Sequence, residues 1–324
     1  ISIVNNFVQI TPIRIQLLKI PFHKPHITNE EVDSVIETMR SGWLTMGPKT
    51  IQFENKFKEN IGSQYAISVN SATSALHLAL NAVDIRIGDE VIMPTNTFIA
   101  TAEAVVYSGA KPVLCDIEKT YHNIDINSIK KLITPKTKAI IPVHFGGHPC
   151  EMEEIINIAK KYNLKVIEDA AHALPSFYRN KKIGSFSDAV CFSFYATKTL
   201  STGEGGMVTT NNKKIAEKVK LQRLHGINGD AWKRYERDND WYYEVIDLGY
   251  KYNTTDIQSA IGLVQLEKLE WMRDERKIIA EKYKNAFTGK LNFINEDNNN
   301  ESSWHLFVIK IGNRDELHQK LKGK

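Results

Sequence analysis

Short apolar runs alternate with amphipathic segments along most of the chain after residue 65. We expect strands at 66–69, 90–93, 112–115, 139–143, 165–168, 189–194 and 207–210, with helical patterns between them, such as 72–83, 97–107 and 151–162. This alternation predicts an α/β fold in which helices cover both faces of a mostly parallel sheet. Ligands of such sheets bind at the carboxyl ends of the strands, so candidate site residues are sought there.

Two further helices are expected before the first strand. Thr28 and Glu31 have the spacing of a capping box ahead of an amphipathic pattern that runs to about Arg40. Thr50 is expected to cap a second helix, which Gly62 ends.

The composition is that of an ordinary globular protein and excludes some classes of partner. Of the 324 residues, 42% are hydrophobic and 25% are charged, and the net charge of +4 comes from basic residues interspersed with acids. We therefore expect neither a nucleic-acid nor a membrane partner. Three scattered cysteines in or beside apolar runs indicate buried, reduced thiols and a cytoplasmic location. Residues 1–19 are interpreted as an appended segment, because polar residues interrupt their apolar character.

One lysine stands at the end of a predicted buried strand. Lys198 follows the apolar run 189–194 and precedes a segment rich in Gly, Ser and Thr. Partial burial there would lower its pKa, and a neutral amine is the nucleophile that forms Schiff bases. On this pattern alone, an ordinary surface lysine is an equally good interpretation.

Two other strand ends carry groups that complement an amine. Small hydroxyl residues from Ser71 to Thr73 open a helix and could hold an anion, although simple capping by Ser71 also explains them. Asp169 ends another strand, and the alternative is that it only caps a helix. Glu168, its neighbour, must point to the opposite face, so the two acids cannot share one role.

Other chemistries are less well supported. His144 and His148 resemble metal ligands, but their spacing matches no zinc pattern, so we predict no metal site. The chain also lacks a P-loop motif and a G-x-S-x-G nucleophile motif.

Seven ordered stretches resemble the sugar aminotransferase family of fold-type I pyridoxal-phosphate enzymes. Pyridoxal phosphate needs a phosphate site, a carboxylate on its pyridinium nitrogen and a Schiff-base lysine, and the three strand ends offer all of these. The matching stretches are SGWLTMGP, NSATSAL, GDEVIMPTNTFIAT, GAKPVLCDI, IEDAAHA, FSFYATKTLSTGEGGM and GYKYNTTDIQSAIGLVQL.

The resemblance implies a role for each matching residue. Lys198 would bind the cofactor covalently and shuttle a proton, Asp169 would hold the pyridine nitrogen protonated, and His172 would lie beside the phenolic oxygen. Phe98 would stack on the ring, and a phosphate site would comprise Ala72, Thr73 and Ser193. Thr45 would lie near the substrate, and either Lys251 or Asn253 would reach the phosphate of a second subunit, which implies a homodimer with shared active sites.

The resemblance further implies an activity and a division into domains. The activity is transfer of an amino group, with glutamate as the expected donor, to a nucleotide-linked 4-keto sugar for surface-polysaccharide or lipopolysaccharide synthesis. The variant GYKYN at 249–253 is similar to the branch that makes 4-amino-4-deoxy-L-arabinose on uridine diphosphate. A large cofactor-binding domain would span 20–265, and a smaller α/β domain, shortened relative to the family, would span 266–324.

Two alternatives remain open at this point. A related sugar dehydratase would use pyridoxamine phosphate, but that branch carries His where this chain has Lys198. The chain could also be an inactive, shortened homologue that acts as a binding module.

Overall fold

The main sheet is mostly parallel, as the sequence predicts. The computed structural model describes residues 21–228, 243–296 and 299–322, and its largest sheet has the strand order β1-β9-β8-β5-β4-β2-β3. Only the pairs that β9 makes with β1 and β8 are antiparallel. The bounds are Tyr65–Val69 (β1), Glu90–Pro94 (β2), Lys111–Cys115 (β3), Thr137–Ile140 (β4), Lys165–Asp169 (β5), Ala189–Ser193 (β8) and Gly206–Thr210 (β9). The α/β fold class and all seven expected strands are therefore confirmed, with small shifts at the strand ends.

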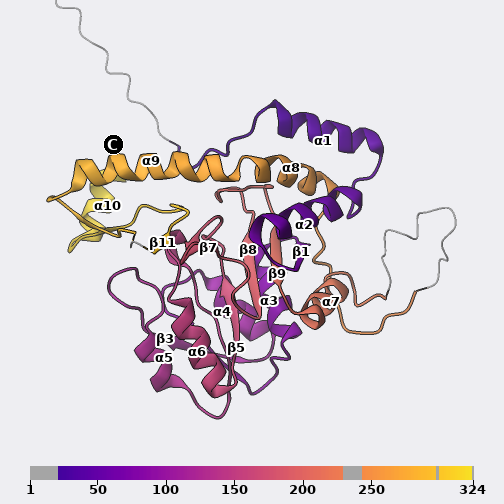
Figure 1. Cartoon of the computed structure of the whole chain (residues 1–324), viewed down its shortest axis with the longest axis horizontal. Helices are drawn as coiled ribbons and strands as arrows, with labels where there is room; N and C mark the ends of the chain where they lie inside the picture. Colours follow the sequence, from indigo (N-terminus) through magenta and orange to yellow (C-terminus); the bar gives the residue numbers. More distant parts are fainter. Residues whose placement is uncertain (1–20, 229–242, 297–298, 323–324) are drawn as a thin grey trace, which may run out of the picture.

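Helices cover both faces of this sheet (Figure 1). Buried side chains form two clusters, one on each face. The first includes residues of α2 (Pro48–Ile61), α5 (Ile126–Leu132), α6 (Met152–Tyr162) and α8 (Asp256–Glu267). The second includes residues of α3 (Ala72–Ala82), α4 (Ile99–Tyr107) and α7 (Lys213–Gln222). Apolar strands buried on both sides explain why the sequence shows continuous apolar runs there.

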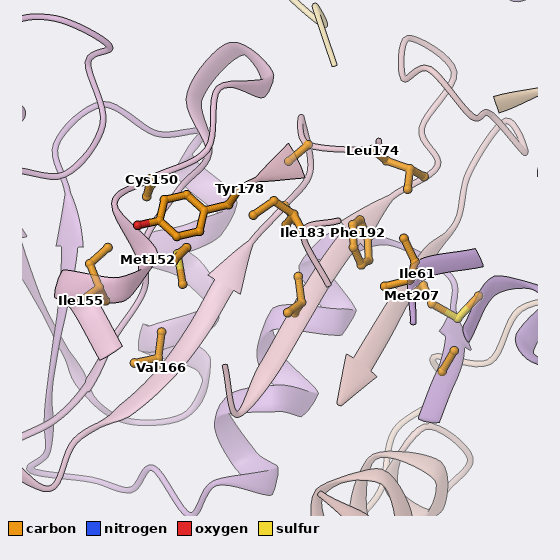
Figure 2. Packing of buried hydrophobic residues seen from close by; sticks show 14 of the residues in the cluster. Ile61, Cys150, Met152, Ile155, Val166, Leu174, Tyr178, Ile183, Phe192 and Met207 are labelled. Atoms are coloured by element: carbon orange, nitrogen blue, oxygen red, sulfur yellow. The ribbon is translucent and has the colours of Figure 1, made fainter. Parts of the chain in front are cut away.

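The first cluster joins helices and strands that lie far apart in the chain. Figure 2 shows Met152 and Ile155 of α6 near Tyr178, with Phe192 and Met207 further along the sheet. The three cysteines are free and buried, as predicted from their apolar surroundings.

The helix caps were predicted correctly in one case and wrongly in the other. Thr28 forms the expected capping box at the start of α1 (Asn29–Ser41). Thr50 does not cap α2, which begins at Pro48 after the N-cap Gly47. Instead, the carboxylate of Asp256 accepts hydrogen bonds from the backbone N–H groups of Gly47 (2.8 Å) and Thr50 (2.9 Å). This cap comes from a residue distant in the chain, so no local pattern could reveal it.

The last part of the chain packs under a long helix, α9 (Leu269–Phe287) (Figure 1). Strands β10 (Asn292–Phe293) and β12 (Ile309–Lys310) form a two-stranded sheet, and α10 (Arg314–Lys322) follows. Strand β11 (Asn300–Glu301) instead joins β6 (Phe177–Tyr178) and β7 (Lys181–Lys182). The C-terminal segment is thus attached to the preceding part of the chain.

The expected division of the chain at residues 265 and 266 falls within α8, and the two-domain organisation stays a prediction. The segment 1–19, interpreted as appended, lies outside the described residues. In the described ranges, no helix combines the length and the apolar character that crossing a membrane requires.

Candidate active site

The expected site residues lie where several strands end. Strands β1, β5 and β8 run in the same direction, so their carboxyl ends meet at one edge of the sheet. Asp169 and Ser193 are the last residues of β5 and β8. Strand β9 runs in the opposite direction and therefore begins at this edge, at Gly206.

Lys198 lies in the turn after β8, where its backbone N–H donates to the Tyr195 carbonyl (2.9 Å). Burial lowers the pKa of the Lys198 amine, and the negative charge of Asp169 opposes this effect in part. The lowered pKa agrees with the prediction made from the strand-to-turn setting. Among the described residues, its Nζ has no hydrogen bond or ion pair, so the amine is available to react.

The two consecutive acids of β5 have different partners, as their opposite orientations require. Asp169 Oδ2 accepts a hydrogen bond from the Thr101 hydroxyl (2.8 Å), and its Oδ1 accepts one from the backbone of Ala171 (3.1 Å). Glu168 points to the other face, where it bonds to His144 (2.9 Å) and Ser187 (2.6 Å). No helix begins at Asp169, so the alternative that it caps one is wrong.

His172 lies on the Lys198 side of β5. Burial, reinforced by the charge of Lys198, lowers the pKa of His172 to about 3, so the ring is neutral at physiological pH. Its Nδ1 accepts a hydrogen bond from the Gly146 N–H (3.3 Å). We therefore assign the ring proton to Nε2, which can donate a hydrogen bond.

A candidate phosphate site lies at the start of α3. Ser71 caps this helix by accepting a hydrogen bond from the Ser74 N–H (3.1 Å), so the capping interpretation is confirmed. Capping leaves the N–H groups of Ala72 and Thr73, in the first helical turn, without intrahelical acceptors. A Cβ on Gly206 would lie 2.8 Å from the Ala72 nitrogen. Only glycine therefore lets the start of β9 approach the helix so closely.

Gly206 also brings Ser193 to this place, because the two residues pair in the β8–β9 ladder. The segment 249–253 lies beside the same strand end. Asn70 donates its backbone N–H to the Tyr252 carbonyl (2.8 Å) and its side-chain amide to the Lys251 carbonyl (3.4 Å). Lys251 is exposed, and Asn253 has a buried Oδ1 that lacks a hydrogen-bond partner.

Phe98 and Thr45 lie at the margin of this group. Phe98 immediately precedes α4 and is 76% exposed, whereas Thr101, one turn later, bonds to Asp169. Thr45 is exposed in the loop before α2, and its carbonyl accepts a hydrogen bond from the Asp256 N–H (3.2 Å). The roles expected for Phe98 and Thr45 therefore stay predictions.

His144, which the sequence offered as a metal candidate, makes two hydrogen bonds within the protein. Its Nε2 bonds to Glu168, and its Nδ1 accepts the backbone N–H of Cys150 (3.1 Å). Across the described part of the chain, no three His, Cys, Asp or Glu side chains are grouped so that they could hold a metal ion.

Comparison with known proteins decides the family. The profile of the DegT/DnrJ/EryC1/StrS aminotransferase family matches residues 25–324. The chain belongs to this family. It is thereby a member of the pyridoxal-phosphate-dependent sugar aminotransferases.

Sequence relatives of this aminotransferase match over most of its length. An uncharacterized protein of Methanocaldococcus jannaschii, MJ1066, is 53% identical over 294 residues, which are 90% of this chain and 76% of that protein. The spore coat polysaccharide biosynthesis protein SpsC of Bacillus subtilis is 46% identical over 296 residues, with the same coverage of 90% and 76%.

Among solved structures, the putative sugar aminotransferase Spr1654 of Streptococcus pneumoniae in its PMP form superposes with a TM-score of 0.88 at 32% identity. The match covers 94% of this chain and 83% of that one. A PLP form of the same protein gives 0.87. These similarities establish the fold and the cofactor, pyridoxal phosphate.

The residues of this aminotransferase fit that cofactor. Lys198, Asp169 and His172 lie together: they supply a partly buried amine without a partner, a carboxylate whose charge reaches it and a neutral histidine. Free N–H groups at the start of α3 and the Ser193 hydroxyl supply donors suited to a phosphate.

Sequence reasoning missed several residues that shape the site. Thr101 bonds to Asp169 and Gly146 bonds to His172, although neither was singled out. Thr101 lies in the PTNTFIAT stretch, which was used only for Phe98. His305, from the SSWH segment, lies beside His172 with ring centroids 4.3 Å apart and the rings tilted by 33°. Nothing local to residue 305 indicates that contact.

Proposed function

We propose that this aminotransferase moves an amino group from glutamate to a nucleotide-linked 4-keto sugar that is used in polysaccharide synthesis. The observation that carries the proposal is the meeting of Lys198 and Asp169 at one sheet edge, with the first turn of α3 alongside. The name of SpsC, a polysaccharide biosynthesis protein, supports the destination of the product. The closer likeness to the 4-amino-4-deoxy-L-arabinose branch rests on the GYKYN sequence alone.

Each side chain has a task that its surroundings support. Pyridoxal phosphate, when bound, withdraws electrons from the substrate carbon that carries the amino group. Lys198, with its lowered pKa, can accept and return a proton at Nζ near that carbon. Asp169 would hold a proton on the pyridine nitrogen by its negative charge, and Thr101 fixes its carboxylate.

His172 and the start of α3 position the cofactor. Because the Gly146 N–H donates to Nδ1 of His172, the Nε2–H of that ring is left to donate to the phenolic oxygen. Ala72, Thr73 and Ser193 would bind the phosphate, where the helix dipole favours negative charge. Phe98 would stack on the ring, and Thr45 would contact the substrate.

A homodimer would complete this site. Exposed apolar side chains lie along the candidate site, including Phe98, Ile99 and Tyr195, and a second subunit would cover them. Lys251 or Asn253 would then reach the partner's phosphate. The dimer and the cytoplasmic location stay predictions, and analytical ultracentrifugation measures the first.

The direct test is mass spectrometry of the products formed from glutamate and a panel of nucleotide keto sugars. A gain of the amino group at the sugar supports the proposal, and loss of a hydroxyl without amination would favour a dehydratase. Absence of any reaction with glutamate would favour a binding module.

A single substitution tests the central residue. Lys198→Ala should remove the visible absorbance of the lysine-bound cofactor, whereas Lys181→Ala, at an exposed position, should keep it. A Lys198→Ala protein that retains this absorbance would exclude Lys198 from the reaction.

A further inference from the structure

A group of basic side chains beside Lys198 has no part in the roles described so far. His305 lies in the segment between β11 and β12, Arg276 lies on α9, and His23 precedes α1. These three residues, called the basic cluster below, come from three separate parts of the chain. Arg276, His23 and Lys198 all lower the pKa of His305, so these side chains lie near one another.

Backbone and side-chain contacts fix His305 in this position. Ser303 donates its hydroxyl to the His172 carbonyl, and the Leu306 N–H donates to Gly146 (3.2 Å). Between them, Trp304 has a left-handed φ of +51°, a conformation that is unfavourable for a large side chain. The turn brings the His305 ring to 4.3 Å from that of His172, between ring centroids.

Helix α9 is attached to the same segment. Arg273 donates to the Ser302 carbonyl (3.4 Å) and pairs with Glu301. Arg276 lies one helical turn further along α9, on the same face of the helix. Unlike Arg273, it has neither an ion pair nor a hydrogen bond with any described residue.

The polar atoms of the basic cluster lack partners. His305 Nδ1 and His23 Nε2 are buried and have no hydrogen bond within the described ranges. Buried polar groups without partners are rare in folded proteins, because each costs free energy. A ligand that accepts hydrogen bonds would satisfy these atoms.

The electrostatics specify the sign of that ligand. Burial is the largest cause that lowers the pKa of His305 to about 2, followed by the charges of His172, Lys198, Arg276 and His23. The four side chains named here are all basic. The charged amine and guanidinium of Lys198 and Arg276 would attract an anion, and the neutral histidine rings can donate hydrogen bonds to it.

We propose that the basic cluster binds the two carboxylates of a dicarboxylic amino-acid donor. His305, beside His172 and Lys198, takes the α-carboxylate, and Arg276 takes the distal carboxylate, for which a guanidinium is well suited. This inference rests on the proposed function and names the residues that select the donor.

The place of the cluster favours the donor over the nucleotide sugar. In an amino acid, the α-carboxylate is bonded to the carbon that carries the reacting amino group. In a nucleotide-linked 4-keto sugar, the diphosphate is attached across the ring from the reacting carbon. Because Lys198 is near enough for its charge to act on His305, the anion nearer the reacting carbon is the one that the cluster can reach.

The test compares Arg276→Gln, Arg276→Lys and His305→Gln in the cofactor-loaded protein. Lys282→Gln is the matched control, since Lys282 is an exposed lysine on the same helix. Conversion of the bound cofactor is followed in single turnovers with glutamate and with alanine. Calorimetry with glutarate, a dicarboxylate without an amino group, supplies a readout that is independent of turnover.

We expect Arg276→Gln to weaken apparent glutamate and glutarate binding about 10- to 100-fold, with the maximal rate nearly unchanged. Alanine, which lacks the distal carboxylate, should be unaffected, and Arg276→Lys should restore part of the loss. His305→Gln should weaken both amino acids. Lys282→Gln should change neither.

Three results would overturn the inference. The first is unchanged glutamate and glutarate binding in folded Arg276→Gln protein. The second is weaker reaction of a nucleotide keto sugar with the pyridoxamine-loaded variant while glutamate is unaffected, because the cluster would then serve the diphosphate. The third is equal weakening of both substrates. Failure of the wild-type protein to convert its cofactor with glutamate would instead overturn the proposed function.

Discussion

The two faces of strand β5 at its carboxyl end differ in how fully their charges are paired. On one face, Glu168 and His144 form a fully buried pair at 2.9 Å, with Ser187 on the second carboxylate oxygen. On the other face, the Lys198 amine has no bonded partner in the described part of the chain, although Asp169 lies near enough for its charge to act on it. Glu168 thus stabilises the fold, whereas its neighbour Asp169 helps to form a site.

This contrast shows which face of the strand has groups that are still free to bind a cofactor or a substrate. A charge that is already paired inside the protein cannot also bind a cofactor or substrate without losing its partner. The unpaired amine, the neutral His172 and the basic cluster all lie on the Asp169 side. Unsatisfied groups at this edge are therefore an indication of function.

Removing Glu168, the acid that is fully paired, should have the largest effect on stability. Glu168→Ala should lower the free energy of unfolding by about 3–5 kcal/mol, because it leaves His144 buried without its carboxylate. Urea denaturation measures this change, with Asp169→Asn as the control that should lose far less. Equal losses in the two variants would contradict the difference between the faces.

Neutralising Asp169, the acid on the Lys198 side, should change the reaction rate more than the stability of the fold. Asp169→Asn keeps a group that can bond to Thr101 but loses the charge, so the rate of the half-reaction with glutamate should fall about 10²- to 10³-fold. Stopped-flow absorbance measures this rate. Glu168→Gln should leave the rate per folded molecule nearly unchanged, and a similar fall there would remove the distinction.

The third expected effect concerns pH and is the smallest when taken over one pH unit. His172 has a pKa of about 3 in the folded protein, below its ordinary value of 6.5, so between these values the unfolded state binds more protons. Stability should therefore decrease as the pH falls from about 6.5 towards 3, by up to about 1.4 kcal/mol per pH unit for this group. Urea titrations of wild-type and His172→Asn protein should show a shallower dependence in the variant. An unchanged slope would exclude the buried neutral ring as its source.

Much of the fold could be read from local patterns. The apolar runs at 66–69 and 189–194 are strands because alternating helices bury them on both faces. Thr28 and Glu31 form the capping box that their spacing predicts. Thr50 failed as a cap because Asp256, which is distant in the sequence, replaced it. Local chemistry predicts only those contacts whose partners are also local.

The sequence alone determined which residues can supply reactive or binding groups: an amine after a buried strand, an acid ending another strand and small residues opening a helix. The tertiary structure alone decided their partners. It paired Glu168 with His144, left Lys198 unpaired and turned His305 towards His172 across a separation of more than a hundred residues. The physical reason is that pairing and burial depend on which segments share an edge of the sheet, and that edge forms only when the strands assemble.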